Sequence, residues 1–157
     1  MTDGGVFCDP GGNLLRTFSA KDCFAIRMAE MNGYPVAVIT GGRQPSIRIR
    51  MQGCGVPDED VYLGSRDKLQ DFNDFCARYG LDPSEVMFFG DDVPDIPVMK
   101  ACGCGACPSD AADDVLAAAD LVSEYPGGRG FIRHEVERVM KGSGRWNFHV
   151  DEYKKRF

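Results

Sequence analysis

Histidine, tryptophan and long apolar runs are scarce in this sequence. Among its 157 residues there are 2 histidines and 1 tryptophan, and no stretch approaches the roughly 18 consecutive apolar residues of a membrane span. His134 and His149 have no partners at metal-ligand spacing, so we expect neither a histidine metal site nor a membrane protein. The first five residues have neither the basic start nor the apolar run of a signal peptide, and we therefore expect a cytoplasmic protein.

Clustered basic charge and paired cysteines are also missing. The 18 Lys and Arg residues are scattered among 24 Asp and Glu, and the net charge is −6. This distribution argues against nucleic-acid partners, because binding to a phosphate backbone needs clustered cations. Seven cysteines are an odd number for a secreted disulfide framework and indicate a reducing compartment. The cysteines within 102–107 lack a second pair of ligands at matching spacing, so a zinc-binding module is the least favoured alternative.

The pattern of apolar runs predicts one α/β domain. Unbroken apolar runs bounded by glycine are typical of strands buried on both faces, and here they alternate with runs of helical period. The expected elements are a hairpin over 5–18, strands at 34–39, 60–63, 85–89, 102–106 and 120–123, and helices over 22–31, 69–79, 96–101, 110–118 and 130–140. The tail after Gly142 has no clear period. Alternating strands and helices predict a single Rossmann-like parallel sheet with helices on both faces and a small β-hairpin.

Chemistry-bearing residues follow three of the predicted strands. They are Thr40-Gly41-Gly42 after the first, Lys68 after the second, and Asp91, Asp92 and Asp95 after the third. Ligands of such sheets bind at the carboxyl ends of the strands. A hydroxyl with flexible amides suits a phosphate, an ammonium suits an anion, and carboxylates suit Mg²⁺. Each motif has an alternative interpretation as a turn, a solvated side chain or a helix cap, but their order on successive strand ends favours a phosphate and metal site.

These motifs, in this order, resemble the haloacid dehalogenase superfamily of phosphohydrolases, in its small branch without a cap domain. The residues that carry the resemblance are Thr2–Gly4, Phe18–Asp22, Arg27, Val38–Gly41, Arg50, Lys68, Gly90–Asp92, Asp95, Pro97–Met99 and Gly127–Gly130. They extend over nearly the whole chain. The resemblance implies a phosphatase domain over 1–142 without a cap domain, followed by a C-terminal tail over 143–157.

The resemblance also implies roles for individual residues. In this family one aspartate attacks the phosphorus, a second aspartate two residues on acts as general acid and base, and Mg²⁺ neutralises charge. The implied catalytic residues are Thr40, Lys68, Asp91 and Asp92, and Asp91 is the implied metal ligand. The implied substrate-binding residues are Ser19, Lys21, Asp22, Arg27, Gly41, Arg50 and Lys68. The implied substrate is the sugar-acid phosphate 3-deoxy-D-manno-octulosonate 8-phosphate, an intermediate of lipopolysaccharide synthesis, with a nonulosonate 9-phosphate as the alternative.

The sequence departs from the family pattern at its first motif. That motif reads Asp-x-Asp-Gly-x-x-x-Asp-Gly after an apolar strand, and Asp3-Gly4 matches its last pair. The nucleophile, the acid/base residue and their strand would therefore fall before Met1, and we expect a start assigned too far downstream. A non-catalytic oligomeric subunit is the alternative. Gly42 is a second departure, since many relatives have a charged residue there. The family further implies a homotetramer joined through the hairpin, in which Arg145 or Trp146 of the tail closes a neighbouring pocket.

Overall fold

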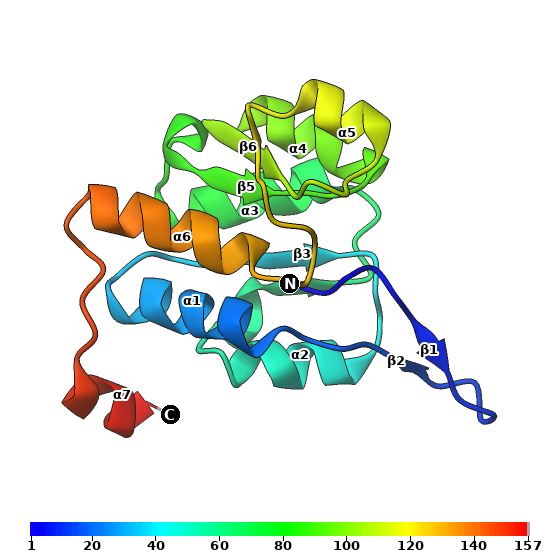
Figure 1. Cartoon of the computed structure of the whole chain (residues 1–157), viewed down its shortest axis with the longest axis horizontal. Coiled ribbons are helices and arrows are strands. Elements are labelled where there is room, and N and C mark those ends of the chain that lie inside the picture. Colours follow the sequence, from blue (N-terminus) through cyan, green and yellow to red (C-terminus); the bar gives the residue numbers. More distant parts are fainter. Residues whose placement is uncertain (157) are drawn as a thin grey trace.

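Helices and short strands alternate along the chain in the computed structural model, which describes residues 1–156 (Figure 1). The strands are β1 Phe7–Cys8, β2 Leu14–Leu15, β3 Val38–Thr40, β4 Val61–Leu63, β5 Met87–Phe89, β6 Cys104–Cys107 and β7 Leu121–Val122. The helices are α1 Ala20–Met31, α2 Pro45–Gln52, α3 Lys68–Tyr79, α4 Ile96–Ala101, α5 Asp113–Ala118, α6 Phe131–Gly142 and α7 Val150–Arg156. The predicted α/β class is confirmed, and these described residues form no cap domain.

The parallel strands form two hydrogen-bonded groups rather than one continuous sheet. In the first group β3 pairs with β4, and Val38 lies opposite Val61. In the second group β5 pairs with β6, and β6 pairs with β7. Among the described residues, β3 and β5 each have one hydrogen-bonded neighbour strand. The antiparallel hairpin of β1 and β2 extends away from both groups (Figure 1).

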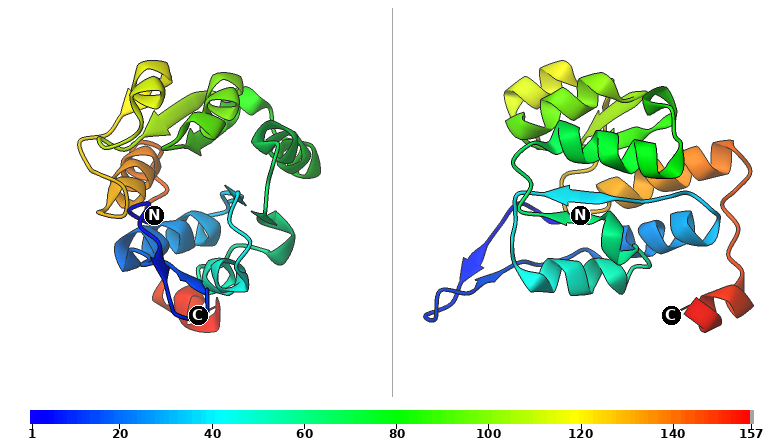
Figure 2. Two further views of the ribbon diagram at one scale, coloured as in Figure 1. Left: turned by 90° about the vertical axis from the view of Figure 1, so that its right-hand side faces the viewer. Right: turned by 180° about the vertical axis from the view of Figure 1, so that it is seen from behind.

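Helices connect the two strand groups on either side. Figure 2 (left) shows α1 and α6 next to each other on one side of the space between the groups and α3 on the other. Phe72 and Cys76 of α3 are buried in a cluster that also takes Ile39 from β3 and Phe88 from β5. Apolar residues of both strand groups therefore pack against the same helix, which fixes the groups relative to each other.

The helix boundaries follow from local sequence signals. α1 begins after Ser19, whose Oγ accepts a hydrogen bond from the Asp22 amide at 3.3 Å. α3 begins after Asp67, whose carboxylate accepts from the Gln70 amide at 3.0 Å, and ends at Gly80 with a φ of 64°. The left-handed conformation at Gly80 is the C-terminal signal expected of glycine, so the predicted end of this helix is confirmed.

The first parallel strand is shorter than the sequence pattern predicts. The apolar run over 34–39 suggested a strand, but β3 begins only at Val38. Pro35 has no amide hydrogen to offer a neighbouring strand, and the amide of Val36 donates instead to Oε1 of Glu30 at 2.9 Å. The structure also contains α2, which the sequence pattern did not predict. Pro45 lies in the first turn of α2, where the amide of a residue has no hydrogen-bond partner within the helix, so the missing N–H of proline does not destabilise it.

The C-terminal tail packs against α1 of its own chain. The ring centroids of Phe24 and Phe148 are 5.9 Å apart, and those of Phe148 and Tyr153 are 5.3 Å apart. The Arg133 guanidinium lies 4.9 Å from the Trp146 ring centroid. The tail, which lacked a clear period in sequence, thus includes the short helix α7 and is held mainly by aromatic contacts. None of the helices over residues 1–156 combines the length and apolar character needed to cross a membrane.

Candidate active site

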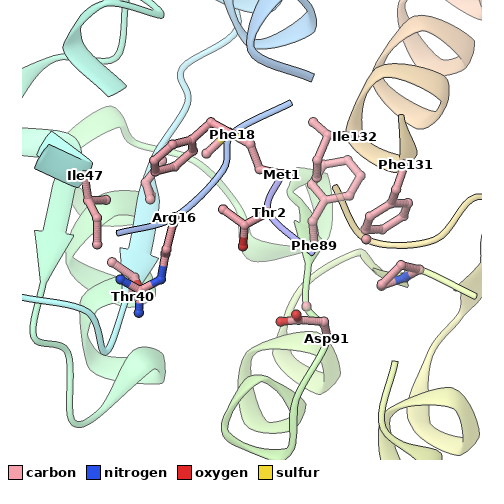
Figure 3. Close-up of a pocket in the computed structure, with 14 residues that line it drawn as sticks. Met1, Thr2, Arg16, Phe18, Thr40, Ile47, Phe89, Asp91, Phe131 and Ile132 are labelled. Carbon is pink, nitrogen blue, oxygen red and sulfur yellow. The ribbon is translucent and has the colours of Figure 1, made fainter. Parts of the chain in front are cut away.

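A pocket lies where β3 and β5 end, between the two strand groups (Figure 3). Its lining residues come from the N-terminus, the ends of both strands and the start of α6: Met1, Thr2, Arg16, Phe18, Val38, Thr40, Ile47, Phe89, Gly90, Asp91, Pro108, Gly127, Phe131 and Ile132. Figure 3 shows Thr40 and Arg16 on one side, Asp91 on the other, and Met1 and Thr2 between them. Two of the predicted catalytic residues therefore lie on one pocket, although they are 51 positions apart in sequence.

Thr40 lies at the last position of β3, in a turn held by backbone hydrogen bonds. Its Oγ1 accepts a hydrogen bond from the Gly42 amide at 3.1 Å, and its carbonyl accepts from the Ser65 amide at 2.9 Å. The Gly42 carbonyl accepts a hydrogen bond from the Gly64 amide at 2.8 Å. The loops that follow β3 and β4 are therefore joined by two backbone hydrogen bonds. This side of the pocket presents a hydroxyl and backbone amides, groups that bind phosphate oxygens without a formal charge.

Asp91 follows β5 in a loop organised by Asp95. One carboxylate oxygen of Asp95, Oδ2, accepts hydrogen bonds from the amides of Asp91 at 3.0 Å and Asp92 at 3.2 Å. The side chain of Asp95 is buried, with 3% of its surface exposed. A Cβ at Gly90 would lie 2.5 Å from Cβ of Asp95, so only glycine lets the strand end approach this carboxylate.

Lys68 joins the same network from the start of α3. Its Nζ lies 2.5 Å from the other carboxylate oxygen of Asp95, Oδ1. Lys68 is not in contact with the pocket itself, but it is connected through one carboxylate to the backbone that carries Asp91. The structure therefore brings together the lysine and the metal-ligand candidate that the sequence placed on successive strand ends.

The carboxyl group of Asp91 is suited to hold a cation. Surrounding protein desolvates it, and the Asp95 carboxylate adds a like charge, so the pKa of Asp91 is raised above its ordinary value, although Lys68 and the N-terminal amine oppose this shift. A divalent cation beside Asp91 would offset that unfavourable charge. Residues 1–156 contain no cluster of three or more His, Cys, Asp or Glu side chains that could coordinate a metal together. Asp91 fits a magnesium ion that takes one or two carboxylates and completes its coordination with water and substrate phosphate.

Asp92 has a structural role in the same loop. Its Oδ1 accepts a hydrogen bond from the Val93 amide at 2.8 Å, and Asp92 and Asp95 cap the short 3₁₀ helix Val93–Asp95 reciprocally. The side chain of Asp92 does not line the pocket. A catalytic role for Asp92 stays a prediction.

Ser19 and Asp22 make contacts within the chain and do not line the pocket. Ser19 caps α1, and Asp22 is fully buried and accepts a hydrogen bond from the Arg133 amide at the start of α6 at 3.0 Å. The second carboxylate oxygen of Asp22 has no hydrogen-bond partner among the described residues and lies 3.9 Å from the N-terminal amine of Met1. Asp22 thus joins α1, α6 and the N-terminal segment that enters the pocket.

The remaining predicted substrate-binding residues lie away from the pocket. Arg27 donates hydrogen bonds to the Gly53 carbonyl and to the hydroxyl of Tyr153. Arg50 lies beside the buried thiol of Cys23, and the Cys54 thiol together with this guanidinium lowers the pKa of Cys23 to about 6. Lys21 lines a separate groove described below. Gly41 follows Thr40 in the sequence but is not among the residues that line the pocket. Substrate binding by these four residues stays a prediction.

Two further residues contribute to the site: Asp95, which the sequence placed after the third strand without a catalytic or binding role, and Arg16, which it did not indicate. Asp95 holds the Asp91 loop and Lys68, and its spacing of three residues from Asp92 is that of a capping pair, a signal present in the sequence. Arg16 reaches the pocket after the hairpin, where its Nη1 donates to Oε1 of Gln44 at 2.8 Å. No local pattern indicates Arg16, because its position depends on how the hairpin returns to the strand groups.

Comparisons with known proteins identify the fold family. A family model of haloacid dehalogenase-like hydrolases matches residues 20–103. The chain is 30% identical over 145 residues to the 3-deoxy-D-manno-octulosonate 8-phosphate phosphatase KdsC of Escherichia coli K12, covering 92% of this chain and 76% of that protein.

Two solved structures are similar over most of their length. The crystal structure of the 3-deoxy-D-manno-octulosonate 8-phosphate phosphatase from Yersinia pestis matches with a TM-score of 0.89 at 29% identity, covering 93% of this chain and 78% of that one. The phosphatase from Moraxella catarrhalis, in complex with magnesium ion, phosphate ion and a KDO molecule, matches in fold with a TM-score of 0.87 at 23% identity, covering 92% and 82%.

The fold and the pocket therefore define a hydrolase of the α/β class whose site lies at the ends of parallel strands. The chain belongs to the haloacid dehalogenase-like hydrolase family. The Moraxella catarrhalis phosphatase was solved with a bound magnesium ion. The predicted family and the predicted class of enzyme are confirmed.

Proposed function

We propose that this chain is a phosphomonoesterase that hydrolyses 3-deoxy-D-manno-octulosonate 8-phosphate to the free sugar acid and phosphate. The observation that carries the proposal is the pocket on which Thr40 and Asp91 both lie, with Lys68 joined to the Asp91 loop through Asp95. The similarity to KdsC over 92% of the chain supports this choice of substrate class.

The phosphate-binding side of the proposed site is built around Thr40. Its hydroxyl and the exposed backbone at Gly41 would donate hydrogen bonds to the phosphate oxygens. The ammonium of Lys68 supplies positive charge from the start of α3, and its ion pair with Asp95 fixes its direction. A preorganised cation is worth most where charge develops on the transferring phosphoryl group, because no reorganisation is needed during the reaction.

Asp91 is the proposed magnesium ligand. Bound Mg²⁺ would supply charge neutralisation on the phosphoryl oxygens. Asp95 positions Asp91 through the two amide hydrogen bonds, and the loop cannot shift without breaking them. We assign Asp92 the part of capping this loop, which is a positioning role.

We infer that the nucleophile and the acid/base residue are aspartates on a strand that leads into Met1. Two observations support this inference: β3 and β5 each pair with a strand on one side only among residues 1–156, and Met1 and Thr2 line the pocket between them. A strand inserted there would bring its carboxylates between Thr40 and Asp91. The non-catalytic oligomeric subunit is the competing hypothesis.

The proposed function is tested by comparing two proteins. One is the chain of 157 residues, and the other carries the in-frame codons upstream of Met1 in the source genome. We expect phosphate release from 3-deoxy-D-manno-octulosonate 8-phosphate with Mg²⁺ only from the longer protein, and we expect beryllium fluoride to form an aspartyl-phosphate mimic on an added aspartate. An in-frame stop codon directly before Met1, or no turnover by the longer protein, would favour the non-catalytic subunit.

The substrate is tested by comparing two sugar-acid phosphates. A nonulosonate 9-phosphate carries the same phosphate and carboxylate on a longer chain, so equal specificity constants would contradict the proposed substrate. Arg27→Ala and Lys21→Ala test the predicted substrate contacts. If either residue binds the sugar acid, its substitution raises KM at least tenfold, since a charge-assisted hydrogen bond contributes about 1.5–3 kcal/mol.

The proposal includes a homotetramer and a cytoplasmic location. Phe7 and Leu15 of the hairpin are 66% and 50% exposed, which supports an interface there. All seven cysteines are free thiols, as suits a reducing compartment. Phe7→Asp should lower the molar mass measured by light scattering from that of a tetramer, whereas Lys100→Asp, at an exposed position of α4, should not.

A further inference from the structure

A second concave surface lies on the exposed side of α6. We call it the basic groove; its lining residues are Lys21, Tyr125, Arg129, Gly130, Arg133, His134, Glu137, Arg138 and Lys141. It has a volume of about 620 Å³, within the range of small-molecule sites. None of these residues lines the pocket of Thr40 and Asp91, so the two surfaces are separate.

The charge of the basic groove is opposite to that of the chain. Five of the 18 Lys and Arg residues line it with a single acidic residue, Glu137. The whole chain nevertheless has a net charge of −6. A cluster of cations in a concave surface raises the local concentration of anions, and it does so here against a negative background.

The cations of the groove differ in how far their charge is already compensated. Glu137 lies 2.5 Å from Nε of Arg133 and 2.6 Å from Nζ of Lys141, and Glu135 lies 2.9 Å from Arg138. Lys21 and Arg129 are exposed, and no carboxylate oxygen of residues 1–156 lies within 4.0 Å of their charged nitrogens. Lys21 and Arg129 are therefore the two lining cations whose charge is not compensated by a carboxylate among the described residues.

Two aromatic rings line the same groove as these two cations. The rings of Tyr125 and His134 are 4.6 Å apart between centroids, with an interplanar angle of 34°. Tyr125 is 37% exposed and the His134 side chain is 38% exposed, so both present ring surface to the groove. Flat ring faces beside guanidinium and ammonium groups are suited to an anion that also carries a planar or apolar part.

We propose that the basic groove binds an anion with two or more linked phosphate groups, held by Lys21 and Arg129. A single phosphate would pair with one of these two cations. A chain of linked phosphates could contact both Lys21 of α1 and Arg129 of the loop before α6. The chemistry has two sources, a free inorganic polyphosphate and a nucleoside polyphosphate. The proposal goes beyond the phosphatase function and does not depend on it.

The test measures binding of inorganic tripolyphosphate and of a nucleoside triphosphate by calorimetry, at low salt and with EDTA. The double variant Lys21→Ala/Arg129→Ala should weaken tripolyphosphate binding at least about tenfold, because two charge-assisted contacts are lost. Lys100→Ala is the matched control, since it removes an exposed charge from α4. Thr40→Val tests the catalytic pocket, and neither single variant should change the affinity more than twofold.

The outcomes separate the two surfaces and the two sources. Unchanged binding to the double variant, or a loss with Thr40→Val instead, would overturn the proposal by placing the anion elsewhere. Tighter binding of the nucleoside triphosphate than of tripolyphosphate, abolished by Tyr125→Ala, would assign the aromatic surface to the base. Equal binding of both would assign the groove to the phosphate chain alone.

Discussion

The two strand groups hold their sides of the proposed active site in different ways. At the end of β3, Thr40 is fixed by the hydrogen bond from the Gly42 amide to its hydroxyl and by backbone hydrogen bonds between neighbouring loops. At the end of β5, Asp91 is fixed by one buried carboxylate that binds two amides and a lysine. A neutral phosphate-binding turn survives the loss of a single side chain, whereas a charged network depends on each member. We therefore expect the side of the proposed site that carries Asp91 to be more sensitive to single substitutions than the side that carries Thr40.

Asp95→Ala should have the largest effect on this comparison. The variant leaves the ammonium of Lys68 without its partner and two amides without an acceptor, so the free energy of unfolding should fall by about 3 kcal/mol or more. Urea unfolding followed by circular dichroism measures this change. Asp92→Ala removes a cap from the same loop and should cost about 1 kcal/mol. Equal losses for the two variants would show that Asp95 does not organise the loop.

Thr40→Val should affect activity more than stability. Loss of one hydroxyl hydrogen bond should lower the free energy of unfolding by about 1 kcal/mol. Phosphate release by the active protein should fall at least about tenfold, because the variant lacks the proposed phosphate-binding hydroxyl. Parallel unfolding and turnover measurements separate the two. Thr40→Ser restores the hydroxyl and should recover most of the activity. A stability loss as large as that of Asp95→Ala would remove the contrast between the two strand ends.

Glu30 makes the first strand group sensitive to pH. Burial raises the pKa of Glu30 from 4.5 to about 7, although the Val36 amide opposes the shift. The folded protein therefore binds more protons than the unfolded chain between these values, and its stability should fall as the pH rises from about 4.5 to 7. Urea unfolding at several pH values should show a loss of about 1–3 kcal/mol, which is below the full equivalent of the shift because Glu30 is only partly buried. Glu30→Gln should flatten this dependence, and an unchanged slope in the variant would assign the dependence to another group.

Trp146→Ala should have the smallest effect, because the tail lies outside both strand groups. Its contact with Arg133 contributes about 0.5–1 kcal/mol, and the residues of the pocket should keep their hydrogen-exchange protection. Exchange should increase only over residues 143–156. Increased exchange at the ends of β3 or β5 would mean that the tail supports the site within its own chain.

Much of this fold could be predicted from sequence where the signal is local. The helix over Ile96–Ala101 and the end of α3 at Gly80 follow from period and capping residues. α2 could not be predicted in this way, because Ile47 and Ile49 alternate with polar residues as in a strand, and only burial of Ile47 and Met51 reveals the helical face.

The site residues that follow a strand end could be predicted from the sequence. The positions of residues that depend on contacts with distant parts of the chain could not. Thr40 and Asp91 reach one pocket because parallel strands end at the same edge. Arg27 donates a hydrogen bond to Tyr153, 126 positions further along the chain, and Lys21 lines a groove with residues of α6 and of the loop before it. Such long-range partners leave no pattern in the sequence around either residue.

The hydrogen bond from the Arg133 amide to Asp22 also has a consequence for the order of folding. The two residues are separated by 111 positions, and the bond joins the first long helix to the last one that packs on it. Closing such a long loop carries a high entropic cost that nearby contacts do not share. During synthesis, the carboxylate of Asp22 in α1 cannot accept this hydrogen bond until the residues up to Arg133 have been made. We therefore expect α1 and α6 to dock together in the last step of folding.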